Sequence, residues 1–230
     1  MSAPTLQLLC ETCGYPIDGI TASAACPECG RPIDESLPAR RIGSPWQQCP
    51  GLRAWALTGW RLLRHPRAAW SAVRIERRQS ASLLLANLIF SAALGTATLL
   101  PGPAWSAPIR YTLAFFTILF LLLLALSTVE YAGIRFLGKH HAFRITESVA
   151  LTTCAHASYG WLLSGAGLAI AAQVLQRIGP FWNASMGFRG GRNTGVLLAG
   201  GIMLIAFVSG MIAYSILCGL GYRALRYANS

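Results

Sequence analysis

Long apolar runs dominate the chain from about residue 82 onward. Crossing a hydrocarbon core about 30 Å thick takes about 20 helical residues. Four runs are long enough, and they cover residues 82–100, 111–132, 148–172 and 195–221. The third and fourth are rich in Gly, Ala and Ser, the residues that let helices pack closely in lipid. We therefore expect an all-α integral membrane helical bundle of about four transmembrane helices.

A mixed pattern of apolar and basic positions precedes the first apolar run. Five apolar residues within 52–63 share one helical face, and Arg53, Arg61 and Arg64 lie opposite; the five are Leu52, Trp55, Ala56, Trp60 and Leu63. A helix of this kind that also carries tryptophans is suited to a bilayer surface, and Pro66 ends or kinks it. The residues we expect at the membrane surface are Arg53, Trp55, Trp60, Arg61, Arg64 and Trp70. The pattern equally fits a juxtamembrane segment that only obeys the positive-inside rule.

Four of the seven cysteines fall within the first 29 residues, in "CETCG" and "CPECG". A gap of two residues lets both sulfurs of a turn face one ion, and the glycine that follows permits the positive φ that closes the turn. Two such turns supply four thiolates at about 2.3 Å, the closed coordination of a structural zinc site. The expected ligands are Cys10, Cys13, Cys26 and Cys29, with zinc as the ion and iron as a minor alternative.

These patterns divide the chain into three parts. Residues 1–38 are expected to form a zinc ribbon, residues 39–80 a basic amphipathic connector with a juxtamembrane helix, and residues 81–230 the transmembrane bundle.

Charge is distributed unevenly among these parts. The chain has 19 Lys and Arg against 8 Asp and Glu, and nine of the arginines lie in residues 40–78. Residues 1–35 have a net negative charge, with five acidic side chains and one basic side chain, Arg31. Because phosphate neutralisation supplies most of the affinity for nucleic acid, an acidic head excludes that partner and favours a protein partner.

The flanks of the apolar runs indicate an orientation. The first nine residues lack the basic start and apolar core of a signal peptide, so we expect the N-terminus in the cytoplasm. With that start, fifteen Lys and Arg fall on the cytoplasmic side of the four spans and four on the other side. We expect a multi-pass protein of the cytoplasmic (inner) membrane with both termini in the cytoplasm, where thiols stay reduced and paired cysteines bind metal.

Polar groups at membrane depth are functional candidates because they are costly there. The candidates are Glu130, for which Arg135 is a plausible partner, His156 near the middle of the third run, and Asn87 in the first. His156 is either a ligand or proton relay, or a neutral histidine hydrogen-bonded to Asn87 or a backbone carbonyl. Catalytic motifs such as HExxH and Gly-x-Ser-x-Gly are missing from the sequence, and we expect no enzyme.

Two resemblances follow from these stretches. "CPECG" matches the CPxCG motif of short bacterial zinc ribbons, and "CETCG" matches it except for the proline. From the connector onward, "RLLRHPRAAWSAVR" and "ESVALTTCAHASYGWLLSG" resemble bacterial Yip1-type integral membrane proteins. That resemblance implies a polytopic bundle, usually of five spans, with non-enzymatic roles in membrane organisation.

The combined expectation is a non-enzymatic membrane adaptor or membrane-organising protein. Its cytoplasmic ribbon would recruit a protein partner, its connector would bind membrane lipid, and the small-residue faces leave room for a homo-oligomer. The alternative is a small transporter or channel with the ribbon as a cytoplasmic gate or metal sensor.

Overall fold

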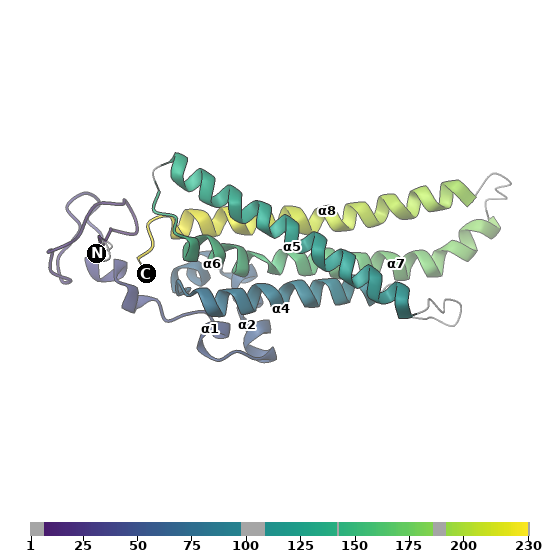
Figure 1. Ribbon diagram of the computed structural model, residues 1–230, viewed down its shortest axis with the longest axis horizontal. Coiled ribbons are helices and arrows are strands. Elements are labelled where there is room, and N and C mark those ends of the chain that lie inside the picture. The colour runs from purple at the N-terminus through teal and green to yellow at the C-terminus, as the bar shows by residue number, and fades with distance from the viewer. Residues whose placement is uncertain (1–6, 98–108, 142, 186–191, 230) are drawn as a thin grey trace. The chain divides into compact units, whose positions relative to one another are not determined.

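The computed structural model describes residues 7–97, 109–141, 143–185 and 192–229, with side chains of the last two helices described up to Val174 and from Gly200. Every regular element among these residues is helical (Figure 1). The elements are the 3₁₀ turns η1 (Ile33–Ser36) and η2 (Pro38–Arg40) and the helices α1 (Pro45–Gln48), α2 (Leu52–Arg64), α3 (Pro66–Ala72), α4 (Arg77–Thr96), α5 (Ile109–His140), α6 (Glu147–Ala157), α7 (Tyr159–Ser185) and α8 (Arg192–Leu225).

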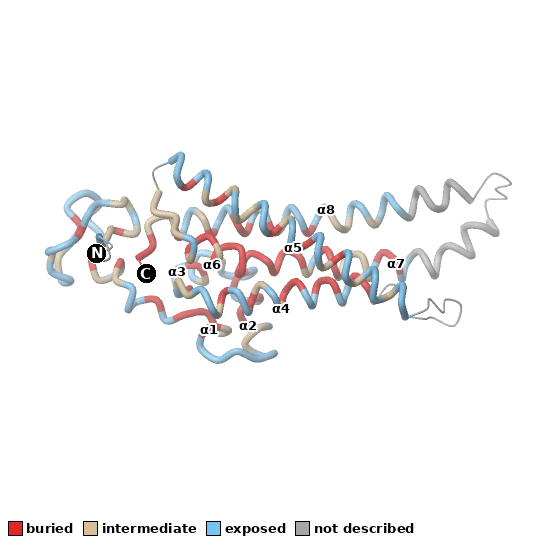
Figure 2. Tube along the Cα trace, in the orientation of Figure 1, coloured by how far each residue is buried: buried red, intermediate tan, exposed pale blue. Residues whose placement is uncertain are grey.

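Within the described part of the chain, three helices are long and apolar enough to cross a membrane. They are α4, α5 and the part of α8 from Gly200 to Leu225. They coincide with the first, second and fourth runs predicted from the sequence, although residues 98–100 of the first run lie outside the described residues. Figure 2 shows why they need lipid, since much of the surface of α5 and of the described part of α8 is exposed. These helices indicate a membrane protein.

The third predicted run is divided between two helices. α6 ends at Ala157 and α7 begins at Tyr159, with a turn at Ser158 between them. The Ser158 hydroxyl is fully buried and accepts a hydrogen bond of 2.8 Å from the Asn87 amide. Side chains of α7 beyond Val174 lie outside the description, so the third span stays a prediction.

The described chain forms two compact units. One comprises residues 1–83, 129–156 and 218–230, and the other residues 84–128 and 157–217. α4, α5 and α8 each contribute residues to both units, and the expected order of ribbon, connector and bundle stays a prediction.

Small residues bring the helices of the second unit together. A methyl group added at Gly165 of α7 would overlap the backbone of Ser91 in α4. One added at Gly160 would overlap the backbone of Tyr214 in α8. The larger Trp161 fills the remaining space and donates its indole N–H to Ser127 of α5 at 3.0 Å. Close contact through small residues is what stabilises helix pairs that gain nothing from leaving lipid.

In the first unit the connector folds back on itself. The helix predicted before Pro66 is present as α2, and Pro66 starts α3 because its fixed φ suits the first position of a helix. α1 begins with a capping box in which Ser44 and Gln47 exchange side-chain and backbone hydrogen bonds. Gln47 also bonds the backbone of Arg74 in both directions, at 2.8 and 3.0 Å, which ties the start of the connector to its end.

Candidate metal centre

Two turns of the same geometry carry the four clustered cysteines. In the first knuckle, residues 10–17, the Cys10 N–H donates to Tyr15 and the Gly14 N–H donates to Cys10, both at 2.8 Å. The second knuckle, residues 26–33, repeats both bonds at equivalent positions, at 2.7 and 2.8 Å. Gly14 and Gly30 have φ of +81° and +71°, a region in which side chains other than glycine are strained.

The repeat extends further than the cysteines. "CETCGYPID" and "CPECGRPID" align residue by residue at an offset of sixteen. Ile17 and Ile33 occupy the same place in each copy, are 2% exposed, and donate equivalent backbone bonds of 2.9 and 3.0 Å. Together with two of the cysteines they form the small core of the head, which we define as residues 7–38. The repeated Pro-Ile-Asp is the sequence signal for this core, although none of its side chains is a metal ligand.

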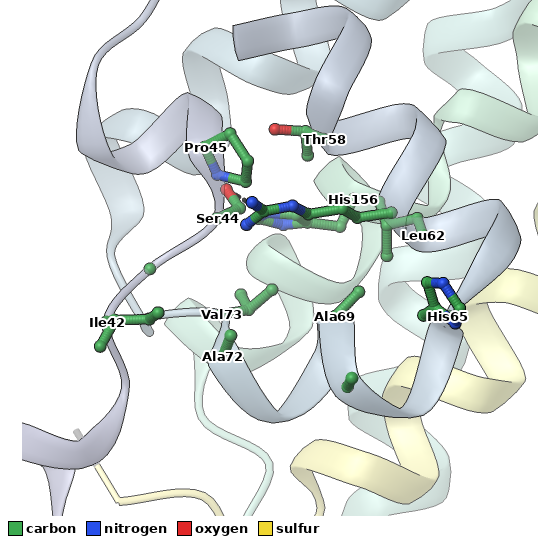
Figure 3. Close-up of a pocket in the computed structure, with 13 residues that line it drawn as sticks. Ile42, Ser44, Pro45, Thr58, Leu62, His65, Ala69, Ala72, Val73 and His156 are labelled. Atoms are coloured by element: carbon green, nitrogen blue, oxygen red, sulfur yellow. Dashed lines mark hydrogen bonds between the residues drawn. The ribbon is translucent and has the colours of Figure 1, made fainter.

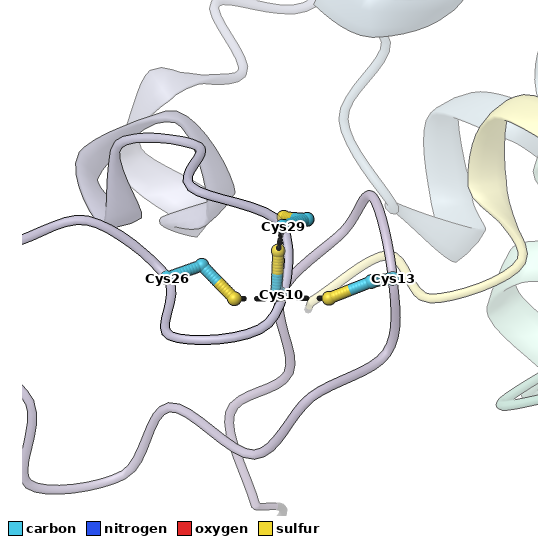
Figure 4. Close-up of side chains that lie close together, drawn as sticks. All are labelled: Cys10, Cys13, Cys26 and Cys29. Carbon is cyan, nitrogen blue, oxygen red and sulfur yellow. Dashed lines mark hydrogen bonds between the residues drawn. The ribbon is translucent and has the colours of Figure 1, made fainter.

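The four sulfurs converge on one point (Figure 4). Two pairs stand 3.6 Å and 3.7 Å apart, Cys10 with Cys29 and Cys13 with Cys26, and all four sulfurs lie within 4.8 Å of one another. A tetrahedron with metal–sulfur bonds of about 2.3 Å has edges of about 3.8 Å. The cysteines could therefore bind a metal ion, and the set is consistent with zinc.

The thiols also need a positive charge among them. Burial raises the pKa of the Cys10 thiol, but backbone N–H groups of Cys13 and Thr12 and the neighbouring thiols lower it overall, to about 6. Burial and the adjacent sulfurs raise the pKa of Cys13 to about 12. One thiolate is thus favoured and further ones are opposed, and a divalent cation at the centre reverses that opposition. With all four positions taken by sulfur, such an ion is structural and leaves no open site for a substrate.

The first knuckle is held by a partly buried ion pair. Arg41, 4% exposed, meets the Glu11 carboxylate with two bonds of 3.2 and 2.7 Å. The same guanidinium donates to the backbone carbonyl oxygens of Trp70 and Val73 at the end of α3, at 3.3 and 3.0 Å. The head and the connector therefore share one arginine.

The C-terminal segment holds the same knuckle from another side. The Asn229 side chain accepts the Leu9 N–H at 3.0 Å and donates to the carbonyl oxygens of Leu9 and Ser36 at 2.7 and 2.8 Å. The Tyr227 ring lies against Gly14, in the space where a side chain at that position would be. These partners are more than 190 residues from the head in the chain, and no pattern in the sequence indicates them.

The predicted intramembrane polar residues have separate partners. His156 is fully buried, with Nδ1 3.0 Å from the Thr152 carbonyl oxygen and Nε2 3.1 Å from the Ser44 hydroxyl. Of its two expected partners the backbone carbonyl is therefore present, and Asn87 bonds Ser158 instead. Arg135 pairs with Glu147 at 3.0 Å, which corrects the partner expected for Glu130.

The predicted membrane-surface residues fall into two groups. Trp60 is 57% exposed, and Arg53, Arg61 and Arg64 are exposed with it on α2, while Trp55 is half-buried. Trp70 corrects the expectation, because it is 1% exposed and packs against Gly221 and the His156 ring, whose centroid is 5.9 Å away.

The fold and the cysteine cluster define a helical membrane protein with a small head that could bind one metal ion. Comparison with family models, curated proteins and solved structures found no match for the chain. The resemblances to CPxCG ribbons and to Yip1-type membrane proteins therefore stay predictions.

Proposed function

We propose that the protein is a non-enzymatic membrane adaptor whose zinc-bound head recruits a cytoplasmic protein partner. The observation that carries this proposal is that the two knuckles differ in their contacts and in their exposure. The first is attached to Arg41, Tyr227 and Asn229, whereas residues 27–32 of the second are all exposed in the described structure. A head fixed along one edge and open along the other is suited to present a rigid contact surface.

The orientation in this proposal comes from the charge bias along the chain. Both termini lie in the cytoplasm, the protein resides in the inner membrane, and the eight exposed arginines of residues 40–78 face the anionic leaflet. The exposed part of the α2 apolar face, which includes Leu52, Trp60 and Leu63, then contacts lipid.

The chemistry of the open surface points to a partner with basic side chains. Glu28 stands exposed on the second knuckle, and Asp18 and Glu35 are exposed elsewhere on the head. Five acids against one arginine in residues 1–35, together with a doubly negative zinc–thiolate centre, make the head acidic. Nucleic acid is disfavoured by the same sign of charge.

The transporter or channel alternative has no observation of its own. It needs polar side chains around a shared pathway, but Asn87 bonds Ser158 and His156 bonds Ser44 and Thr152. These polar groups already have protein partners, which disfavours a shared pathway.

Photo-crosslinking in native membranes tests the proposal. A photoreactive residue is placed at Pro27 on the open knuckle or at the equivalent attached-knuckle position, Glu11. We expect a discrete protein adduct from position 27 that Glu28→Lys abolishes while the zinc content is unchanged.

Asp18→Lys is the matched control, since it makes the same change of charge at an exposed position outside the second knuckle. The adaptor proposal fails if no adduct forms, or if both lysine variants lower the adduct equally, because the open knuckle then has no specific partner.

A further inference from the structure

A cavity of about 330 Å³ lies within the connector, between residues 42–45, α2 and α3 (Figure 3). Its volume is at the lower end of the range for small-molecule sites. The labelled side chains surround the opening, with Ile42 and His65 on opposite sides and Ser44 beside His156. Neither the metal centre nor the proposed adaptor surface accounts for this cavity.

The floor of the cavity is a closed set of neutral hydrogen bonds. Since a carbonyl oxygen only accepts, Nδ1 of His156 must carry the proton that it shares with Thr152 at 3.0 Å. Because full burial of the ring disfavours its charged, doubly protonated form, Nε2 is the acceptor, and the Ser44 hydroxyl donates to it at 3.1 Å. Ser44 also accepts the Gln47 N–H, so these groups leave no charge at the floor.

The wall and the rim have different chemistry. The wall is apolar and is made by Ile42, Leu62, Ala69, Ala72 and Val73. Arg61 and His65 also line the cavity and are exposed. The Arg61 guanidinium has no hydrogen-bond or ion-pair partner among the described residues. An apolar cavity beside an unpaired cation matches a molecule with an anionic end and an apolar end.

The position along the chain indicates where such a molecule comes from. Val73, part of the wall, is four residues before Arg77, where the membrane-crossing candidate α4 begins. On α2, the side chains of Leu52, Trp60 and Leu63 are 72%, 57% and 60% exposed, as expected for a helix in the headgroup region. We therefore expect the cavity close to the level of the lipid phosphates.

We propose that this cavity binds one anionic phospholipid, with its phosphate at Arg61 and His65 and the adjoining apolar part of the lipid against Ala69 and Ala72. The proposal does not depend on the adaptor role, since it concerns the connector and makes no use of the head.

Native mass spectrometry of the delipidated full-length protein tests this site. The protein is titrated with phosphatidylglycerol and, separately, with phosphatidylcholine. We expect one phosphatidylglycerol to bind about tenfold more tightly than phosphatidylcholine, and Arg61→Gln to remove that preference. Arg64→Gln, on the same helix but outside the cavity lining, is the matched control and keeps the preference.

A second pair of variants tests the apolar wall. Ala69→Leu fills part of the cavity and is expected to lower phosphatidylglycerol occupancy at least fivefold, whereas Ala56→Leu on the exposed side of α2 leaves it unchanged. This pair decides the question if Arg61→Gln does not fold. The proposal is overturned if each variant behaves like its control, if the two lipids bind alike, or if glycerol phosphate competes as well as the lipid, which would indicate a site for free phosphate compounds.

Discussion

The two knuckles of the head share one backbone design and have different surroundings. Each has the Cys-x-x-Cys-Gly turn, the same pair of backbone hydrogen bonds and a buried isoleucine at the same place. Among the residues that the structure describes, Arg41, Tyr227 and Asn229 cover the first knuckle, and residues 27–32 of the second are exposed. Both copies of the turn therefore supply ligands to one metal site, whereas one copy alone attaches the head to the connector and the C-terminal segment.

This comparison can be measured with two amide groups. The Ile17 N–H bonds Leu8 in the first knuckle, and the Ile33 N–H bonds Ala24 in the second, at 2.9 and 3.0 Å. Hydrogen exchange at these positions reports the opening of each knuckle separately. If Arg41 and the C-terminal segment hold the first knuckle, loss of one of these contacts should speed hydrogen exchange at Ile17 alone. Loss of the metal should speed exchange at both Ile17 and Ile33.

The largest expected effect is loss of the metal. Cys26→Ser with Cys29→Ser removes two of four ligands, and a head whose core is this small then loses the ion and unfolds. We expect bound zinc to fall from about one per chain to none and protection at Ile17 and Ile33 to disappear together.

Cys49→Ser is the control for thiol chemistry, since Cys49 is an exposed free cysteine outside the cluster. Zinc that survives in the double variant, or protection that survives at Ile17 without zinc, would show that the four cysteines do not form one structural site.

The second-largest effect is expected from breaking the Arg41–Glu11 ion pair. Arg41→Ala removes the guanidinium from the carbonyl oxygens of Trp70 and Val73 and from the Glu11 carboxylate, which keeps only the Asn229 N–H at 3.1 Å. Breaking this largely buried pair costs about 3 kcal/mol. We expect faster exchange at Ile17 and little change at Ile33, with zinc retained.

Arg40→Ala is the matched control, because the Arg40–Asp34 pair is short, at 2.6 Å, but its side chains are 61% and 42% exposed. Solvent screening limits such a pair to about 0–1 kcal/mol. Equal effects of the two alanine variants would mean that Arg41 does not attach the head.

A smaller effect is expected at the C-terminal segment. Asn229→Ala leaves the backbone of Leu9 and the carbonyl oxygen of Ser36 without partners, which costs about 1–3 kcal/mol where these groups stay shielded from water. We expect carboxypeptidase to digest the C-terminus faster, together with faster exchange at Ile17. Digestion at the wild-type rate would contradict the attachment.

The sequence was informative where the structure is local. Two residues between cysteines and a following glycine bring two sulfurs together whatever else the chain does, and all four ligands were predicted to cluster. Three of the apolar runs also form helices long enough to span a membrane, because length and hydropathy suffice for that prediction.

It was uninformative where an apolar or charged side chain has several possible partners. Trp70 fits a helix face that contacts lipid, but it packs against Gly221, where a glycine far along the chain leaves room for the ring. Arg135 is nearer in sequence to Glu130 but pairs with Glu147 of the next helix. The contact between Asn229 and Leu9 spans 220 residues and involves backbone groups, which leave no pattern in the sequence.

The smallest expected effect is also the closest comparison of the two knuckles. Gly14→Ala and Gly30→Ala place alanine at nearly the same positive φ, so each carries a similar strain of about 1 kcal/mol. A methyl group at Gly14 lies 2.8 Å from the Tyr227 ring, whereas at Gly30 nothing stands within 4 Å. We therefore expect Gly14→Ala alone to expose the C-terminal segment to carboxypeptidase.

The same two glycine substitutions can be compared in a Tyr227→Ala background. There, Gly14→Ala and Gly30→Ala should lower the thermal stability equally, relative to Tyr227→Ala alone. If the two losses of thermal stability still differ in that background, the knuckles differ in the turns themselves and not in the residues that cover them.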